Sequence, residues 1–108
     1  MKSAHLVVLC TTPNRDTAQK IADTLVGRKL CACVNVVGGV LSTFFWKSEV
    51  CREEEVLLII KTSSSIYEEL EQTIKEIHPY ELPEIIALPI VAGDKEYLEW
   101  IDKNTNKL

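Results

Sequence analysis

The alternation of apolar and polar residues predicts the first strand and the first helix. Residues 6–10 are continuously apolar, which is typical of a central strand that is covered on both faces. Thr12, Pro13 and Asn14 then form a helix start, since Thr12 or Asn14 can cap the helix and Pro13 suits its first turn. Apolar residues follow at helical spacing on one face, and the pattern predicts that the helix ends at Gly27.

Residues 31–62 form one long predicted hairpin. Gly38 and Gly39 interrupt its first arm in the manner of a β-bulge or bend. The polar stretch 47–49 predicts the turn, although it lacks the glycine that favours tight hairpin turns. The second arm ends in the apolar block 56–60.

The rest of the chain predicts a second helix, an edge strand and a terminal helix. Residues 65–68 have the pattern of a capping box, and the helix that they open ends before Pro79. Residues 85–91 predict a strand, and Pro89 removes one of its ladder donors, so the strand should lie at an edge or carry a bulge. Asp94 can cap the short terminal helix.

This order of elements predicts an α+β fold. It is a ferredoxin-like βαββαβ sandwich with a long hairpin between the second and third strands and a C-terminal helix. The sheet should carry both crossover helices on one face. A length of 108 residues suits one hydrophobic core, so we expect a single domain over residues 1–108.

Three aromatic residues, Phe44, Phe45 and Trp46, follow one another near the end of the hairpin. Neighbouring strand residues point to opposite faces, so large rings should emerge on both sides. Burying each ring contributes roughly 1.5 to 3 kcal/mol, and we therefore expect a neighbouring copy of the chain to cover them. The alternative is that the strand bends at Gly38 and Gly39, and that the rings pack onto their own core.

Charge and hydropathy exclude several classes of protein. The net charge is −4, and residues 49–84 hold ten acidic and three basic side chains, which argues against nucleic-acid binding. This asymmetry could orient one copy against another, or it could mark a solvated acidic face. No apolar run approaches the ~18 to 20 residues that span a bilayer, and no secretory signal is visible. We expect a cytoplasmic protein that does not bind membranes.

The four cysteines are expected to be reduced thiols in such a compartment. Cys31 and Cys33 stand two residues apart, so both thiols should lie on the same face of a strand, in a poor arrangement for a disulfide. The chain has no Cys-x-x-Cys pair, which removes the usual zinc-ribbon and thioredoxin interpretations.

Six stretches in matching order and spacing make the chain resemble the CutA divalent-cation-tolerance family. They are residues 30–35 (LCACVN), 42–46 (STFFW), 55–62, 78–81 (HPYE), 83–85 (PEI) and 97–100 (YLEW). The resemblance implies a ferredoxin-like fold related to the PII signal proteins and a role in tolerance of divalent cations. It also implies a tight homotrimer, in which the long hairpins extend sheets between subunits.

A copper site is also implied by this resemblance. In bacterial relatives the ligands are a cysteine that ends the first strand and two successive histidines before Pro-Tyr. Cys10 and His78 match two of these positions, and Ile77 stands at the third. Thiolate and imidazole suit copper or zinc, but a closed site usually has four ligands, so Glu81, Glu84 or another subunit would have to supply more. Alternatively, Cys10 is a small buried hydrophobe and His78 bonds the last helix carbonyls.

The sequence gives little support for catalysis. His5 and His78 are the two histidines, and the chain has four glycines and no phosphate-binding loop. We therefore expect a protein that is not an enzyme. The alternative function is a PII-like trimeric sensor or scaffold that binds a small organic or anionic ligand, or a partner protein, in a cleft between subunits. The candidate lining residues are Trp46, Lys61, Tyr80 and Glu81.

Overall fold

The computed structural model describes residues 4–105. Its strands are β1 (His5–Thr12), β2 (Cys33–Trp46), β3 (Glu49–Ser63) and β4 (Ile86–Pro89). Its helices are α1 (Arg15–Gly27), α2 (Tyr67–Ile77) and α3 (Lys95–Asn104), with a 3₁₀ turn, η1 (Ser64–Ile66), before α2. The order of elements is the one that the sequence pattern predicts.

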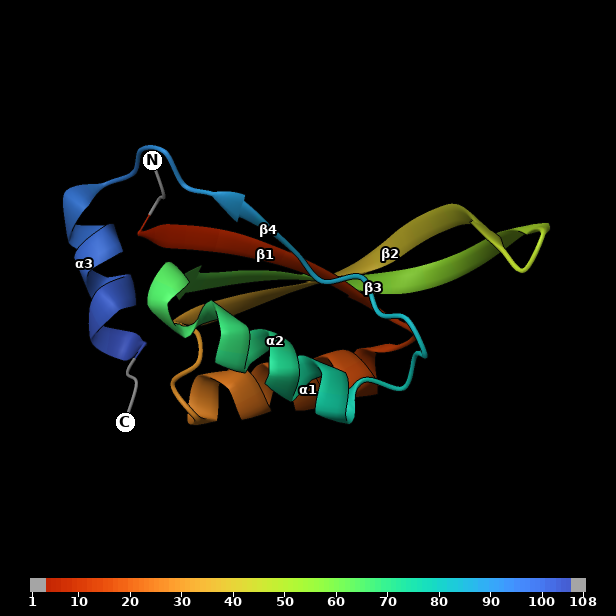
Figure 1. Ribbon diagram of the computed structural model, residues 1–108, viewed down its shortest axis with the longest axis horizontal. Helices are drawn as coiled ribbons and strands as arrows, with labels where there is room; N and C mark the ends of the chain where they lie inside the picture. Colours follow the sequence, from red (N-terminus) through yellow and green to blue (C-terminus); the bar gives the residue numbers. More distant parts are fainter. Residues whose placement is uncertain (1–3, 106–108) are drawn as a thin grey trace.

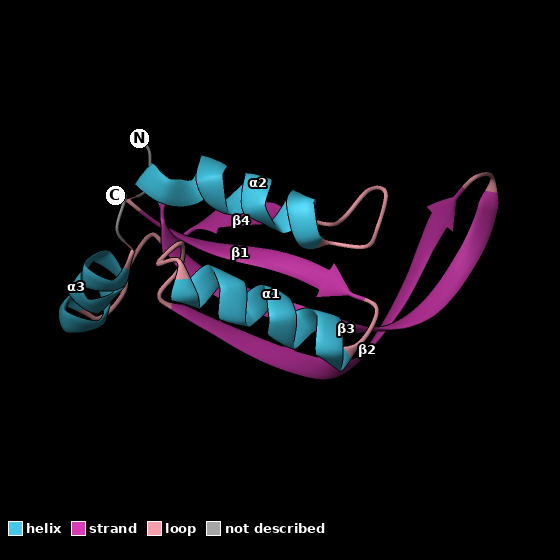
Figure 2. Cartoon of the chain, turned by 90° about the horizontal axis from the view of Figure 1, so that it is seen from below, coloured by secondary structure: helices cyan, strands magenta, loops and turns pink. Residues whose placement is uncertain are grey.

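The four strands form one antiparallel sheet in the order β2-β3-β1-β4. Helices α1 and α2 lie side by side on one face of this sheet, while α3 lies at the end away from the hairpin tip (Figures 1 and 2). This arrangement confirms the α+β, ferredoxin-like prediction. The strand that contains Pro89 lies at the edge of the sheet, as expected for a residue without a ladder donor.

The core lies between the sheet and helices α1 and α2. Alternate residues of the central strands point into it, because successive strand residues face opposite sides. The fully buried residues include Val8, Cys10, Ile21, Leu25, Leu58, Ile60, Leu70 and Ile74. Ile77 packs against this cluster from the end of α2, so it has the packing role that its apolar position predicts.

Helix α1 starts and ends where the sequence predicts, and only the residue that takes the left-handed conformation after it differs. The Asn14 side chain accepts a hydrogen bond from the Thr17 amide at 2.8 Å and caps the helix. Gly27 is the last residue of the helix, as predicted, and the C-cap is Arg28. The left-handed conformation that follows is taken by Lys29, with φ of 59°. A lysine therefore occupies the type of position for which glycine was expected.

The predicted capping box at the start of α2 is wrong. The N-cap is Ile66, which makes no side-chain cap hydrogen bond. The Tyr67 amide instead donates to the Ser64 carbonyl within the 3₁₀ turn, and the Ser65 hydroxyl lies 3.3 Å from that of Ser63. Because β3 leads directly into this turn, backbone hydrogen bonds replace the serine cap.

The β2–β3 hairpin projects well beyond the helices (Figure 1), in a molecule that measures 44 × 27 × 22 Å. Its register shifts between Val37 and Val40, which confirms the predicted bulge at the glycines. The two-residue turn is formed by Lys47 and Ser48, both with positive φ, of 50° and 68°. Two left-handed residues match the twist of a tight hairpin, here without glycine.

Cys31 and Cys33 do not share a face, which corrects the prediction. Cys31 precedes β2 and is buried in the core with 1% exposure. Cys33 is the first residue of β2 and pairs with Lys61, whereas its neighbour Val34 packs against the core. The chain bends at Ala32, so the period of two begins only after that residue. All four thiols are free, as expected.

Helix α3 closes the end of the sheet that lies opposite the hairpin tip (Figure 1). The predicted cap is confirmed, since the Asp94 carboxylate accepts from the Tyr97 amide at 2.9 Å. The helix buries Ile101 completely, and Asp102 Oδ1 lies 2.9 Å from His5 Nε2 on β1. Within residues 4–105, every helix is too short or too polar to cross a membrane.

Candidate functional site

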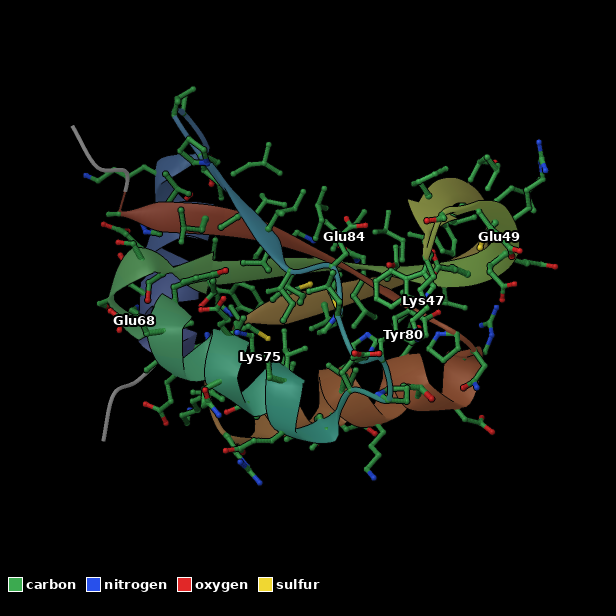
Figure 3. The ribbon with its side chains drawn as sticks, turned by 45° about the vertical axis from the view of Figure 1, so that its right-hand side comes forward. Lys47, Glu49, Glu68, Lys75, Tyr80 and Glu84 are labelled. Carbon is green, nitrogen blue, oxygen red and sulfur yellow. The ribbon has the colours of Figure 1, made fainter. Side chains whose placement is uncertain are left out.

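A groove with a volume of about 1020 Å³ lies between the hairpin and the loop that joins α2 to β4. We call residues 78–85 the 78–85 loop. The hairpin contributes Phe44, Trp46, Glu53 and Glu55 to the groove, among others, and the loop contributes Tyr80, Glu81 and Glu84. Tyr80 and Glu84 are labelled on this loop in Figure 3. Aromatic rings and carboxylates therefore surround the same space.

The period of two along the hairpin explains which of its residues line the groove. Cys51, Glu53 and Glu55 alternate along β3 without a register shift, so their side chains share one face. Phe44 and Ser42 stand opposite Cys51 and Glu53 in the register and also line the groove. The hairpin thus presents one continuous face toward the 78–85 loop.

The Tyr80 hydroxyl donates a hydrogen bond to Glu55 Oε2 at 2.7 Å. Glu55 has only 7% of its surface exposed, whereas its neighbours Glu53 and Glu54 are exposed. Burial, and then the hydrogen bond and the charge of Glu55, raise the pKa of Tyr80 above its ordinary range. The phenol therefore stays protonated at neutral pH and fixes the loop against the hairpin.

Both ring nitrogens of His78 are occupied by backbone groups. Nε2 lies 2.7 Å from the Thr11 carbonyl oxygen, and Nδ1 accepts from the Tyr80 amide at 3.1 Å. An amide N–H can only donate, so the proton of the neutral ring is on Nε2, which donates to Thr11. The ring also lies 4.7 Å from that of Tyr80, measured between centroids. His78 thus fastens the 78–85 loop to the end of β1.

Cys10 is completely buried on β1. Burial, reinforced by the charges of Glu84 and Glu55, raises the pKa of its thiol to about 12. The thiol lies 3.8 Å from the Thr11 carbonyl oxygen, to which it donates. Metal coordination requires the thiolate, and the surroundings of Cys10 disfavour that form.

The residues predicted to hold copper therefore do not fit a metal centre in this conformation. The nitrogens of His78 are engaged, the Cys10 thiol is held protonated, and Ile77 packs against the core. Among residues 4–105, no three His, Cys, Asp or Glu side chains are grouped so that they could hold a metal ion. Copper binding by Cys10 and His78 stays a prediction to be tested in solution.

The structure brings together three of the four residues expected to line a ligand cleft. Trp46, Tyr80 and Glu81 all line the groove. Lys61 does not, because it lies at the other end of β3, near Cys33 and Asn35. Among residues 4–105, the groove is lined by four carboxylates and no basic residue, so its electrostatics favour a cation over the anionic ligand that was one of the expected classes.

Sequence reasoning missed Glu53 and Glu55 as residues of the groove. The period of two along β3 was a signal that these two carboxylates share a face with Cys51. Their approach to Tyr80 depends on the path of the 78–85 loop. No local pattern gives that path, because it follows from the packing of α2 on the sheet.

Comparison with known proteins decides the family. Residues 6–104 match the family model described as CutA1 divalent ion tolerance protein. The chain belongs to this family. A relative from Thermus thermophilus, named divalent-cation tolerance protein CutA, is 46% identical over 99 residues, which cover 92% of this chain and 96% of that protein.

Two further CutA proteins show how widely the similarity extends. The chloroplastic protein CutA of Arabidopsis thaliana is 45% identical over 100 residues, which cover 93% of this chain and 55% of that protein. The crystal structure of CutA1 from the psychrotrophic bacterium Shewanella sp. SIB1 superposes with a TM-score of 0.96 at 39% identity. That superposition covers 99% of this chain and 100% of the other. The fold and family expected from the sequence are thereby confirmed.

Proposed function

We propose that this CutA1 family member works as a homotrimer in the tolerance of divalent cations and is not an enzyme. The observation that carries the proposal is the projecting β2–β3 hairpin. Three of its large apolar side chains are strongly exposed, with Leu41 at 82%, Phe45 at 71% and Val50 at 58% of their surface. A single chain leaves these groups in water, and neighbouring copies would shield them.

The sheet offers a second surface for assembly. Its open face, defined as the face away from α1 and α2, carries Leu9, Ile59, Ile86 and Leu88, and Ile86 and Leu88 are about half exposed. Its two edge strands, β2 and β4, each have one unpaired side within residues 4–105. Unpaired edges add strands from another chain readily. These features support assembly through sheets and hairpins, and the family resemblance supports the number three.

The association with a divalent cation rests on the family and not on the Cys10–His78 pair. Thiolate and imidazole would be the donors for copper, but both residues are engaged within their own chain. We therefore propose that the assembled protein contributes to cation tolerance, with copper as the ion that the resemblance implies, without assigning the ion to these two residues. A cytoplasmic location is part of this proposal.

Native mass spectrometry of the protein taken directly from cells tests this proposal. It reports the number of subunits and any retained metal in one measurement. A trimer at micromolar concentration is the expected result. A stable single-chain species would overturn the assembly, and a trimer without metal after exposure to excess copper would remove the cation from the proposal.

The groove supports a second candidate function, a PII-like sensor of a small ligand. Trp46 and Tyr80 supply aromatic walls, and Glu53, Glu81 and Glu84 supply negative charge. This composition suits an organic cation, which is attracted by both carboxylates and ring faces. A thermal-shift panel of organic cations and anions of matched size tests it, because a ligand raises the melting temperature by mass action. Shifts by cations that are lost in Trp46→Ala would support the sensor, and no shift across the panel would exclude it.

A further inference from the structure

Cys33 and Lys61 stand directly opposite each other on the open face of the sheet. Lys61 Nζ lies 3.8 Å from Cys33 Sγ and also donates to Asn35 Oδ1. The Ala32 amide donates to the Lys61 carbonyl at 2.9 Å, which fixes the register next to the pair. Side chains that face each other across antiparallel strands have Cβ atoms about 4.5 to 5.5 Å apart. An amine and a thiol are therefore held within reach of each other.

The four cysteines differ sharply in their access to small reagents. Cys10 and Cys31 are buried, with 0% and 1% of their surface exposed. Cys33 and Cys51 are both partly exposed. The Cys51 thiol lies 3.9 Å from the Glu49 carbonyl oxygen, whereas the Cys33 thiol has a lysine amine beside it. The chain thus contains a reachable thiol with an amine neighbour and a reachable thiol without one.

Helix α3 contributes a third group to the Cys33 site. Burial, together with the charge of Cys33 and a hydrogen bond to it, raises the pKa of Tyr97. The phenol therefore remains neutral and contacts the same sulfur that Lys61 approaches. Lysine amine, phenol and thiol converge on one point of the open face.

We propose that Cys33 and Lys61 form a reversible sulfenamide crosslink when the protein meets hydrogen peroxide. In the first step the Cys33 sulfur attacks the peroxide, the O–O bond breaks, and the sulfur becomes a sulfenic acid while the peroxide is reduced to water. In the second step the unprotonated Lys61 nitrogen attacks that sulfur. The S–N bond forms, the S–O bond breaks, and the departing hydroxide takes a proton from the amine and leaves as water.

The crosslink would protect the sulfur and change the charge of the open face. Sulfenic acids that find no partner are oxidised further to sulfinic acids, which thiols do not reduce. Lys61 acts as the partner, and its positive charge is lost while the bond persists. A dithiol returns the pair to thiol and amine by breaking the S–N bond, and it is itself oxidised to a disulfide. The pair lies on the open face that the proposed trimer would use, so the inference requires that hydrogen peroxide still reaches Cys33 in the assembled protein. Native mass spectrometry reports that assembly separately from the crosslink.

The test treats the full-length protein with hydrogen peroxide and alkylates the remaining thiols before digestion without reductant. The expected product is a linked pair of peptides that joins Cys33 to Lys61. Its mass is lower, by two hydrogen atoms, than the summed masses of the two separate peptides. Dithiothreitol should restore both peptides. Lys61→Arg keeps the positive charge but should yield no linked pair, and its Cys33 should advance to sulfinic acid.

Control variants distinguish crosslinking at Cys33 from general oxidation of exposed thiols. Cys51 is the internal control, since it should reach sulfinic acid in the same sample without forming a link. Cys51→Ser should keep the crosslink and Cys33→Ser should lose it, so that the result does not depend on one variant folding. Three outcomes would each overturn the proposal. They are the absence of the linked pair in the wild type, equal amounts of sulfinic acid at Cys33 in the wild type and in Lys61→Arg, and a link between two chains.

Discussion

The Tyr80 hydroxyl lies 2.7 Å from Glu55 Oε2 and joins two segments that are 25 residues apart in the chain. One segment is the 78–85 loop after α2, and the other is the base of the β2–β3 hairpin. Glu55 is almost completely buried, so its carboxylate depends on this donor. The contact closes one end of the groove and holds the two walls at a fixed separation.

Replacing Tyr80 with phenylalanine should destabilise the fold. The change leaves the buried Glu55 carboxylate without its donor, at a cost of about 1 to 3 kcal/mol in the free energy of unfolding. Chemical denaturation measures the loss. Tyr67→Phe is the matched control, since the Tyr67 hydroxyl has no hydrogen-bond partner within residues 4–105. A double-mutant cycle with Tyr80→Phe and Glu55→Gln tests whether the two side chains stabilise each other. Additive losses in the free energy of unfolding would contradict that interaction.

Replacing His78 with alanine should weaken the fold but leave copper binding unchanged. The substitution leaves the Tyr80 amide without its acceptor and leaves the Thr11 carbonyl with only the weak Cys10 thiol donor, at a total cost of about 1 to 3 kcal/mol. Thermal unfolding and a copper titration of the reduced protein measure the two effects. Loss of one equivalent of copper in both His78→Ala and Cys10→Ala, with the fold retained, would instead establish the pair as ligands.

The stability of the protein should fall as the pH rises above about 9. The pKa of Cys10 is raised from 9.0 to about 12 in the folded state, so the folded chain keeps a proton that the unfolded chain has lost. The unfolded state then binds fewer protons, and the free energy of unfolding decreases with pH between these two values. Cys31, with the same shift to about 12, acts in the same direction.

The slope of stability with pH tests the contribution of each buried thiol. Each buried thiol contributes at most about 1.4 kcal/mol per pH unit. Cys10→Ala should therefore flatten the decline measured by urea unfolding between about pH 9 and pH 11. Cys31→Ala should flatten the decline in the same way, because burial raises the pKa of that thiol to about 12 as well. Equal slopes in wild type and Cys10→Ala would exclude this explanation.

A charged residue at the hairpin should disrupt assembly without unfolding the chain. Phe45 is 71% exposed and lies beside the turn, so Phe45→Glu removes no contact with the core but places a charge on the proposed interface. Sedimentation should show smaller species with unchanged circular dichroism. Val91→Glu is the control, at a position that is 91% exposed and outside the hairpin. An unchanged sedimentation coefficient for Phe45→Glu would place the interface elsewhere.

The order of elements was readable from the sequence because it depends on local chemistry. Periodicity separates strands from helices, Asn14 and Asp94 cap their helices, and Pro89 lies at a sheet edge. Local rules did not identify which residue takes the left-handed conformation after α1. Lys29 takes it, two residues beyond Gly27, where the helix ends as predicted.

The functional surfaces were decided by tertiary structure. A bend at Ala32 separates Cys31 from Cys33, and the register of β2 with β3 then places Cys33 beside Lys61. The packing of α2 brings Tyr80 onto Glu55. The sequence alone determined which strands, helices and turns form, since neighbouring residues govern them. Only the folded chain determined which side chains meet, because such contacts join distant segments through the shape of a common core.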